Sequence, residues 1–172
     1  HFSIPSDTAC YPAKLMHGHV QTLLDMGVDA IFYPCLTYNM DEKCGVNHYN
    51  CPVVAYYSEL LAGNTEELSK IKFLYPYLNI NDEKQLAIEL YEYLSKYFDG
   101  IKKSEVKAAV AAGTAAYREW MQDIYKAGSA ALESARERGV PVMVLAGRPY
   151  HTDSEIGHGI DRLANSLGFA VV

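Results

Sequence analysis

The 172-residue sequence has no apolar run that approaches the roughly 20 residues needed to span a bilayer, so it predicts no transmembrane helix and no membrane partner. Its first residues form neither the basic nor the apolar part of a signal peptide. The sequence begins without Met and stops inside an apolar run at residues 168–172, so we expect a piece of a longer protein. Together these absences favour a cytoplasmic location, where thiols stay reduced.

Basic clusters are missing as well. The net charge is −6 and no stripe of Lys and Arg is present, which argues against a nucleic-acid partner. The sequence contains no internal repeat and no low-complexity segment. With 49% hydrophobic and 21% charged residues, the composition is typical of a globular protein.

The order of predicted elements indicates an α/β protein. Apolar residues follow helical spacing from Leu15 to Leu24, and Gly27 ends this predicted helix. The next apolar run, residues 28–35, predicts a buried parallel strand that Pro34 stops. The later predicted elements are a polar loop (36–50), a strand (52–57), helices near 64–71, 82–98 and 103–138, a strand (140–146), a turn (147–153), a helix (154–167) and a strand (169–172).

Three parts follow from this order. Residues 1–100 are predicted to form a Cys-rich α/β domain, and residues 101–138 a long Ala-rich connecting helix. Residues 139–172 predict the start of a second α/β unit, a βαβ unit that is truncated at its second strand.

Four cysteines lie at positions suited to a common site. Cys10 directly precedes a predicted helix, whose N-terminus favours a thiolate. Cys35 ends a predicted strand, Cys44 lies in the following loop and Cys51 opens the next predicted strand. Since ligands of doubly wound sheets bind at the carboxyl ends of strands, all four thiols are expected at one sheet edge. Thiolates are soft ligands, suited to zinc or to iron–sulfur clusters.

The cysteine spacing alone does not decide between these alternatives. Successive cysteines are separated by 24, 8 and 6 residues, which matches no compact zinc or ferredoxin pattern. A structural zinc site is disfavoured because the sequence has no CxxC pair. Four buried cysteines acting as small hydrophobic residues remain the alternative interpretation.

Other polar residues qualify as parts of a site. His19 falls on the apolar stripe of its predicted helix and is expected to be a core histidine. For His17, or Lys14 one turn earlier, two interpretations are open: the side chain approaches a pocket around Cys10, or it is exposed to solvent. The turn after the strand at 140–146 places Arg148 and His151 where they would bind an anion, unless it is an ordinary βα turn. Polar residues also crowd the loop between Cys35 and Cys51, as a ligand loop or a solvated one: Asn39, Asp41, Glu42, Lys43, Asn47 and His48.

Several short sequence segments, here called strings, resemble a domain of the large CoA-enzyme activases. These proteins are related to the activators of 2-hydroxyacyl-CoA dehydratases, such as 2-hydroxyglutaryl-CoA dehydratase, and of benzoyl-CoA reductases. The resemblance covers nearly the whole chain, and its Cys-bearing strings are the most specific part. The strings are DTACYPAK (7–14), HGH (17–19), IFYPC (31–35), NHYNCP (47–52) and AGRPYH (146–151).

The resemblance implies a fold and a cofactor. The domain is distantly similar to the cluster-binding dehydratase subunits, which have Rossmann-like domains with a 4Fe-4S cluster held by cysteines from separate strand ends. This similarity implies a three-layer parallel sheet flanked by helices. Cys10 and Cys35 correspond best to cluster ligands, and Cys44 and Cys51 belong to the activase-linked strings. The dehydratase subunits usually draw another ligand from a later domain.

The implied function is that of an iron–sulfur module that assists ATP-driven electron transfer, and the chain is not expected to be catalytic by itself. ATP would bind to the actin-like ATPase domain of the same protein, and the electron acceptor would be an acyl-CoA dehydratase or reductase. One alternative is a non-redox module that binds a CoA-type or phosphorylated ligand through Arg148, His151 and Lys14. Another is a structural adaptor that docks the ATPase domains.

Overall fold

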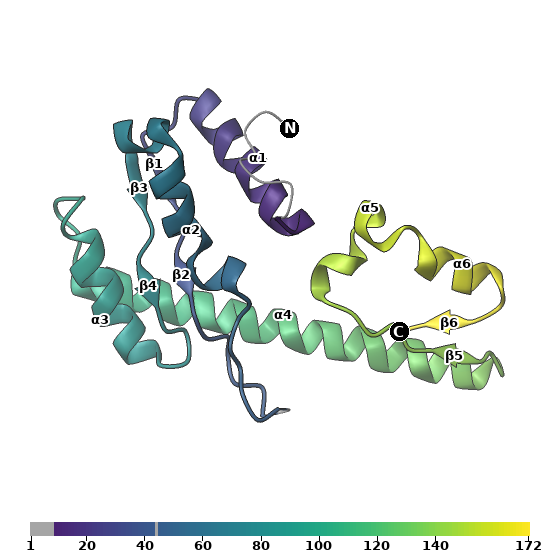
Figure 1. Ribbon diagram of the computed structural model, residues 1–172. Helices are drawn as coiled ribbons and strands as arrows, with labels where there is room; N and C mark the ends of the chain where they lie inside the picture. The colour runs from purple at the N-terminus through teal and green to yellow at the C-terminus, as the bar shows by residue number, and fades with distance from the viewer. Residues whose placement is uncertain (1–8, 44) are drawn as a thin grey trace. The chain divides into compact units, whose positions relative to one another are not determined.

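The structure is a computed structural model that describes residues 9–43 and 45–172 (Figure 1). Its contacts divide the chain into two compact units, His1–Thr114 and Ala115–Val172. The boundary between the units falls inside a long helix, α4 (Lys103–Glu137).

The first unit alternates helices with short strands. Pro12 lies in the first turn of α1 and Pro52 opens α2, where the missing N–H of proline costs no helical hydrogen bond. Asp82 caps α3 by accepting hydrogen bonds from the backbone N–H groups of Lys84 and Gln85. The elements before α4 are α1 (Tyr11–Asp25), β1 (Ala30–Phe32), β2 (Cys35–Leu36), α2 (Pro52–Asn64), the 3-10 helix η1 (Glu66–Lys70), β3 (Lys72–Leu74), β4 (Tyr77–Leu78) and α3 (Glu83–Leu94).

The four strands form two parallel pairs that share one register. Strand β1 pairs with β3, and β2 pairs with β4, with a constant offset of 42 residues between partners such as Ile31↔Phe73 and Cys35↔Tyr77. By this offset Pro34 lies opposite Pro76. Each proline lacks the N–H that a ladder needs, so the pairing is interrupted at the same level on both strands. Backbone hydrogen bonds of 2.8 Å on either side of the interruption keep the strands together.

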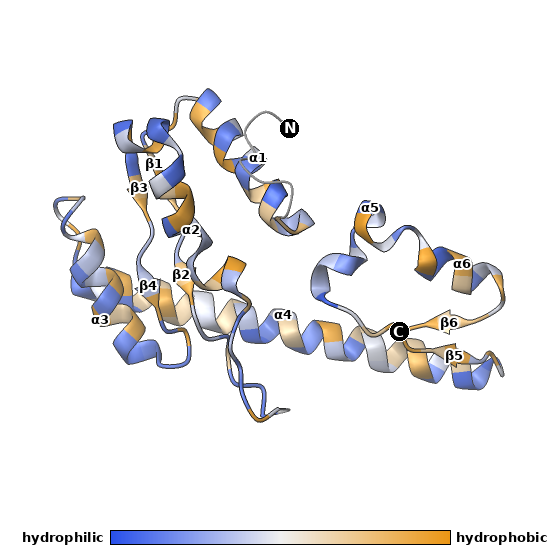
Figure 2. Ribbon diagram, viewed as in Figure 1, coloured by the Kyte–Doolittle hydropathy of each residue, from blue (hydrophilic) through white to orange (hydrophobic). Residues whose placement is uncertain are grey.

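Two hydrophobic clusters hold helices against these strands (Figure 2). Helices α1 and α2 contribute Val20 and Leu61 to a cluster with Ile31 of β1 and Phe73 of β3. Helix α3 and the first turns of α4 pack near β2 and β4 in the second cluster, which contains Leu78, Leu86, Val106 and Val110. Burying a side chain of this size stabilises the fold by about 1.5–3 kcal/mol relative to leaving it in water.

The structure corrects the strand predicted at residues 52–57, which belongs to helix α2. Apolar residues resume at Leu60 and Leu61 after Ser58 and Glu59, which extends the segment to helical length, and a short apolar run cannot be assigned to strand or helix by periodicity alone. Cys51 therefore precedes a helix and does not open a strand. Strands β3 and β4 were not predicted, although they lie between the helices expected near 64–71 and 82–98.

The second unit contains α4 from Ala115 onward and a βαβ-like segment. Strands β5 (Val142–Met143) and β6 (Ala170–Val171) pair in parallel, with Val142 opposite Ala170. The helix predicted at 154–167 is interrupted at His158 and Gly159, which both have positive φ angles. The remaining elements of this unit are the 3-10 helix η2 (Pro149–Thr152), α5 (Ser154–Gly157) and α6 (Ile160–Ser166).

The fold is thus of mixed α/β type, built on short parallel strand pairs. In the part of the chain that the structure describes, no helix combines the length and the apolar character needed to cross a membrane.

Candidate functional site

Cys10 and Cys51 occupy equivalent positions at the starts of two helices. Each is the N-cap residue of its helix, α1 or α2, and both have an extended backbone, with φ of −63° and −65° and ψ of 158°. Neither side chain caps its helix by a hydrogen bond, and both residues are exposed. The two thiols therefore lie beside helix N-termini without being used to stabilise those helices.

Cys35 is a buried thiol on the neighbouring strand. It opens β2, where its N–H donates to the Pro76 carbonyl at 2.8 Å, and its side chain is 0% exposed. Its Sγ atom lies 2.9 Å from Oγ of Ser58, which is also buried, in α2. A helix that precedes a parallel strand runs antiparallel to it, so the starts of α1 and α2 and the carboxyl end of the strands share one edge.

Tyr33 and Tyr57 are electrostatic neighbours of the three described thiols. Burial is the main cause that raises the pKa of Tyr33 to about 12, followed by the nearby Cys35. Tyr57 and Cys51 raise this pKa further. Burial, and then Cys10, raise the pKa of Tyr57. The three described cysteines are therefore all electrostatic neighbours of one or the other of these two phenols, and we call Cys10, Cys35, Cys51, Tyr33 and Tyr57 the thiol site.

His17 supports the thiol site from α1. Its Nε2 atom lies 2.8 Å from the Tyr57 hydroxyl, and the two rings meet edge to face. His17 is buried and His19 is exposed, which reverses the expectation that His19 is the core histidine. The phase of the helix explains the reversal, because Ala13, His17 and Val20 follow i, i+4, i+7 spacing and all are buried. Lys14, in the first turn of α1, is half-buried.

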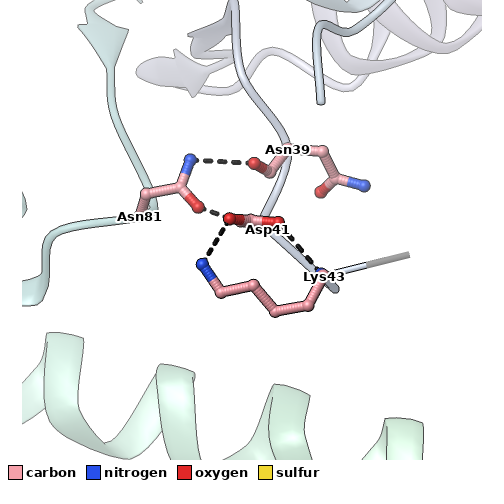
Figure 3. Close-up of polar contacts among 4 residues, drawn as sticks. All are labelled: Asn39, Asp41, Lys43 and Asn81. Atoms are coloured by element: carbon pink, nitrogen blue, oxygen red, sulfur yellow. Dashed lines mark hydrogen bonds and ion pairs between the residues drawn. The ribbon is translucent and has the colours of Figure 1, made fainter. Parts of the chain in front are cut away.

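The polar loop between Cys35 and Cys51 is ordered by side-chain amides (Figure 3). Asn81 donates from Nδ2 to the Asn39 carbonyl at 2.8 Å and accepts from the Asp41 N–H at 2.8 Å. Hydrogen bonds from the Lys43 side chain and backbone lower the pKa of Asp41. Residues Tyr38 and Tyr49 pair as an antiparallel bridge, so the loop returns on itself and delivers the chain to Cys51. Cys44, the fourth predicted ligand, lies outside the described residues.

The described residues do not assemble a closed metal site. Among them, no group of three or more His, Cys, Asp or Glu side chains is arranged to hold a metal ion. The donor chemistry of the thiol site suits iron or zinc, but Cys10, Cys35 and Cys51 alone do not form a preassembled set of ligands.

The predicted anion-binding turn lies in the second unit. The backbone N–H of Arg148 donates to Nδ1 of His151 at 2.8 Å, which makes the imidazole a local cap for η2. A Cβ atom on Gly147 would lie 2.8 Å from that same Nδ1, so a glycine suits this position. Both Arg148 and His151 are exposed.

Sequence reasoning missed Ser58, Tyr33 and Tyr57 as parts of the thiol site. The sequence does contain a signal for strands β3 and β4, which pair with β1 and β2. The dipeptide Tyr33-Pro34 recurs as Tyr75-Pro76 within a similar apolar run. Ser58 and Tyr57 carry no such signal when residues 52–57 are interpreted as a strand, because only the helical phase of α2 directs Ser58 to Cys35 and Tyr57 to His17.

Parallel strands with one buried cysteine on β2 and two exposed cysteines at the N-caps of α1 and α2 define an α/β domain with a thiol site. Comparison with known families then identifies it: the chain matches the CoA enzyme activase uncharacterised domain over residues 1–172 and belongs to that family. Searches of curated proteins and of solved structures gave no match.

Proposed function

We propose that this domain is an iron–sulfur-binding module of a cytoplasmic activase system for acyl-CoA dehydratases or reductases. The observation that carries the proposal is the placement of Cys10 and Cys51 at the N-caps of α1 and α2, together with Cys35, which is buried against Ser58 of α2. Membership of the CoA enzyme activase family supports a role in such a system.

Cys10, Cys35, Cys44 and Cys51 are the residues that would hold a 4Fe-4S cluster. Bound there, the cluster would supply one-electron transfer, assisted by ATP bound to an actin-like ATPase domain. Ser58 lies 2.9 Å from the Cys35 sulfur, and hydrogen bonds to ligand sulfur are one way a protein sets a cluster potential. Since the described thiols do not form a closed set, cluster assembly also requires Cys44 or a rearrangement of the first helical turns.

We also propose that the strands of the first unit belong to a Rossmann-like three-layer sheet. Its support is the pairing register shared by β1–β3 and β2–β4, with separate helix clusters packed on each pair. Parallel strands are rarely stable without helices on both faces, so a three-layer arrangement is the one expected for such strands.

Anaerobic reconstitution with ferrous iron and sulfide tests the cluster. We expect a brown protein that contains iron and gives an electron paramagnetic resonance signal after reduction. Cys10→Ser and Cys51→Ser should each lower the bound iron, whereas Ser69→Ala, an exposed hydroxyl on η1, should not. A colourless, iron-free wild-type protein under these conditions would refute the proposal.

A structural adaptor is the second candidate, and the long helix favours it. Trp120 is 55% exposed, and Ile124 and Tyr125 near it on α4 are also exposed. Exposed apolar groups of this size are typical of contact surfaces. Because Trp120 is the single tryptophan, its fluorescence would report docking: a blue shift on adding the ATPase domain is expected, and an unchanged spectrum at saturating concentration would exclude burial of Trp120.

A further inference from the structure

A cleft of about 370 Å³ lies beside strand β4, next to one face of α3. In Figure 1, α3 lies next to β4, and contacts join the two elements. Glu89, Tyr93 and Tyr97 follow one another at intervals of four residues, so they lie on the same side of α3 and its C-terminal extension. Tyr75 and Tyr77 form the wall on the strand side.

The cleft walls are largely aromatic and hold one another in place. The N–H of Tyr75 donates to the Tyr93 hydroxyl at 3.2 Å, which ties α3 to the edge of the strand. The rings of Tyr93 and Tyr97 lie 5.2 Å apart at 35°. The Tyr77 hydroxyl donates a hydrogen bond to the Glu59 carboxylate of α2. Burial raises the pKa of Tyr93 to about 12, so this wall is uncharged at neutral pH.

Glu89 gives the cleft a negative charge. Of the described residues that line the cleft, it alone carries a charge at neutral pH. Gln85 donates from Nε2 to Oε1 of Glu89 at 2.9 Å, which orients the carboxylate. The nearby ammonium of Lys72 donates to the Tyr97 carbonyl at 3.0 Å and lies over the Phe98 ring, 4.7 Å from its centre. Neither Lys72 nor Phe98 lines the cleft, so this ammonium does not fill the space beside Glu89.

We propose that this cleft binds a small organic cation, an amine or a quaternary ammonium group, between Glu89 and the ring faces of Tyr93 and Tyr97. An aromatic face attracts a cation with about 0.5–2 kcal/mol per contact, depending on desolvation. The volume of the cleft falls at the lower end of the range for small-molecule sites, roughly 300–1,000 Å³. None of the lining residues is a cysteine, so cation binding can be measured on the iron-free protein.

Titration with tetramethylammonium, followed by NMR of labelled tyrosine rings, tests the proposal on the intact chain. We expect saturable shifts of the Tyr93 and Tyr97 ring signals. Glu89→Gln should weaken binding about fivefold, which corresponds to about 1 kcal/mol, the upper end for an ion pair near the protein surface. Glu92→Gln, a carboxylate on the same helix outside this cleft, is the matched control and should leave binding unchanged.

A neutral probe of the same shape, tert-butanol, separates charge recognition from apolar binding. It should bind more weakly than tetramethylammonium, and Glu89→Gln should not change its affinity. Tyr97→Leu removes one ring face at a position that is 39% exposed, so the fold should be preserved. This substitution should lower the affinity for tetramethylammonium. Equal affinity for both probes, or no ring shift at millimolar cation, would overturn the proposal.

Discussion

At the scale of single residues, the buried pair of Cys35 and Ser58 makes the clearest prediction. Both side chains are buried, and each is the other's hydrogen-bond partner at 2.9 Å. Ser58→Ala should lower the free energy of unfolding by about 0.5–1.5 kcal/mol, because the thiol loses its partner in a site that water does not reach. Urea denaturation measures the change.

Ser69→Ala is the matched control for this prediction. Its hydroxyl donates to the Glu66 carbonyl at an exposed site, so water replaces the lost bond. Its effect should stay within about 0.5 kcal/mol. Equal effects of the two substitutions would show that the Cys35–Ser58 contact contributes nothing specific.

Tyr93 predicts how stability depends on alkaline pH. Burial, and then a hydrogen bond with Tyr97, raise its pKa from 10 to about 12 in the folded chain. The unfolded chain therefore releases this proton first, so the contribution of Tyr93 is complete below pH 10 and is lost as pH rises from 10 to about 12. Urea midpoints for wild type and Tyr93→Phe should converge across this window. Parallel pH curves for the two proteins would contradict the assignment.

At the scale of elements, the two N-cap cysteines show what local sequence can predict. The helix after Cys10 was predicted correctly, because Pro12 and the apolar spacing from Leu15 to Leu24 both indicate a helix. The helix after Cys51 was missed, since its first residues are β-branched and aromatic. Its helical state depends on burial of Leu61 against β1 and β3, a contact between distant parts of the chain.

The turn around His151 depends on glycine for steric reasons. A Cβ atom on Gly157 would lie 2.5 Å from the His151 carbonyl oxygen, a backbone atom that cannot move aside cheaply. Gly157→Ala should destabilise the second unit by about 1–3 kcal/mol. A Cβ atom added at Gly128 in α4 would have no neighbouring atom within 4 Å. Gly128→Ala should therefore stabilise the helix by about 0.5–1 kcal/mol. The midpoint of thermal denaturation should fall for Gly157→Ala and rise for Gly128→Ala. A change of the same sign in both variants would refute the steric argument.

At the scale of the whole molecule, the α/β class was predicted and the strand pairing was not. The partners in the first unit are 42 residues apart, and no local pattern specifies which strands meet. The same limit applies to the candidate site. Cysteine positions in sequence indicated a shared edge, but Tyr33 and Tyr57 become their neighbours only through the packing of α2 on the strands.

The division into two compact units predicts that a destabilising substitution in the core of one unit leaves the stability of the other unit unchanged. Leu61 is 1% exposed in the cluster between α1, α2 and the β1–β3 pair, so Leu61→Ala should cost the first unit about 2–5 kcal/mol. Hydrogen exchange should then accelerate in β1 and β3, while β6 and α6 of the second unit keep their protection. Leu60→Ala, at the neighbouring 36% exposed position, is the control and should change neither. Equal acceleration in both units would show that they unfold as one, because the loss of a single core contact would then have removed the packing of the entire chain.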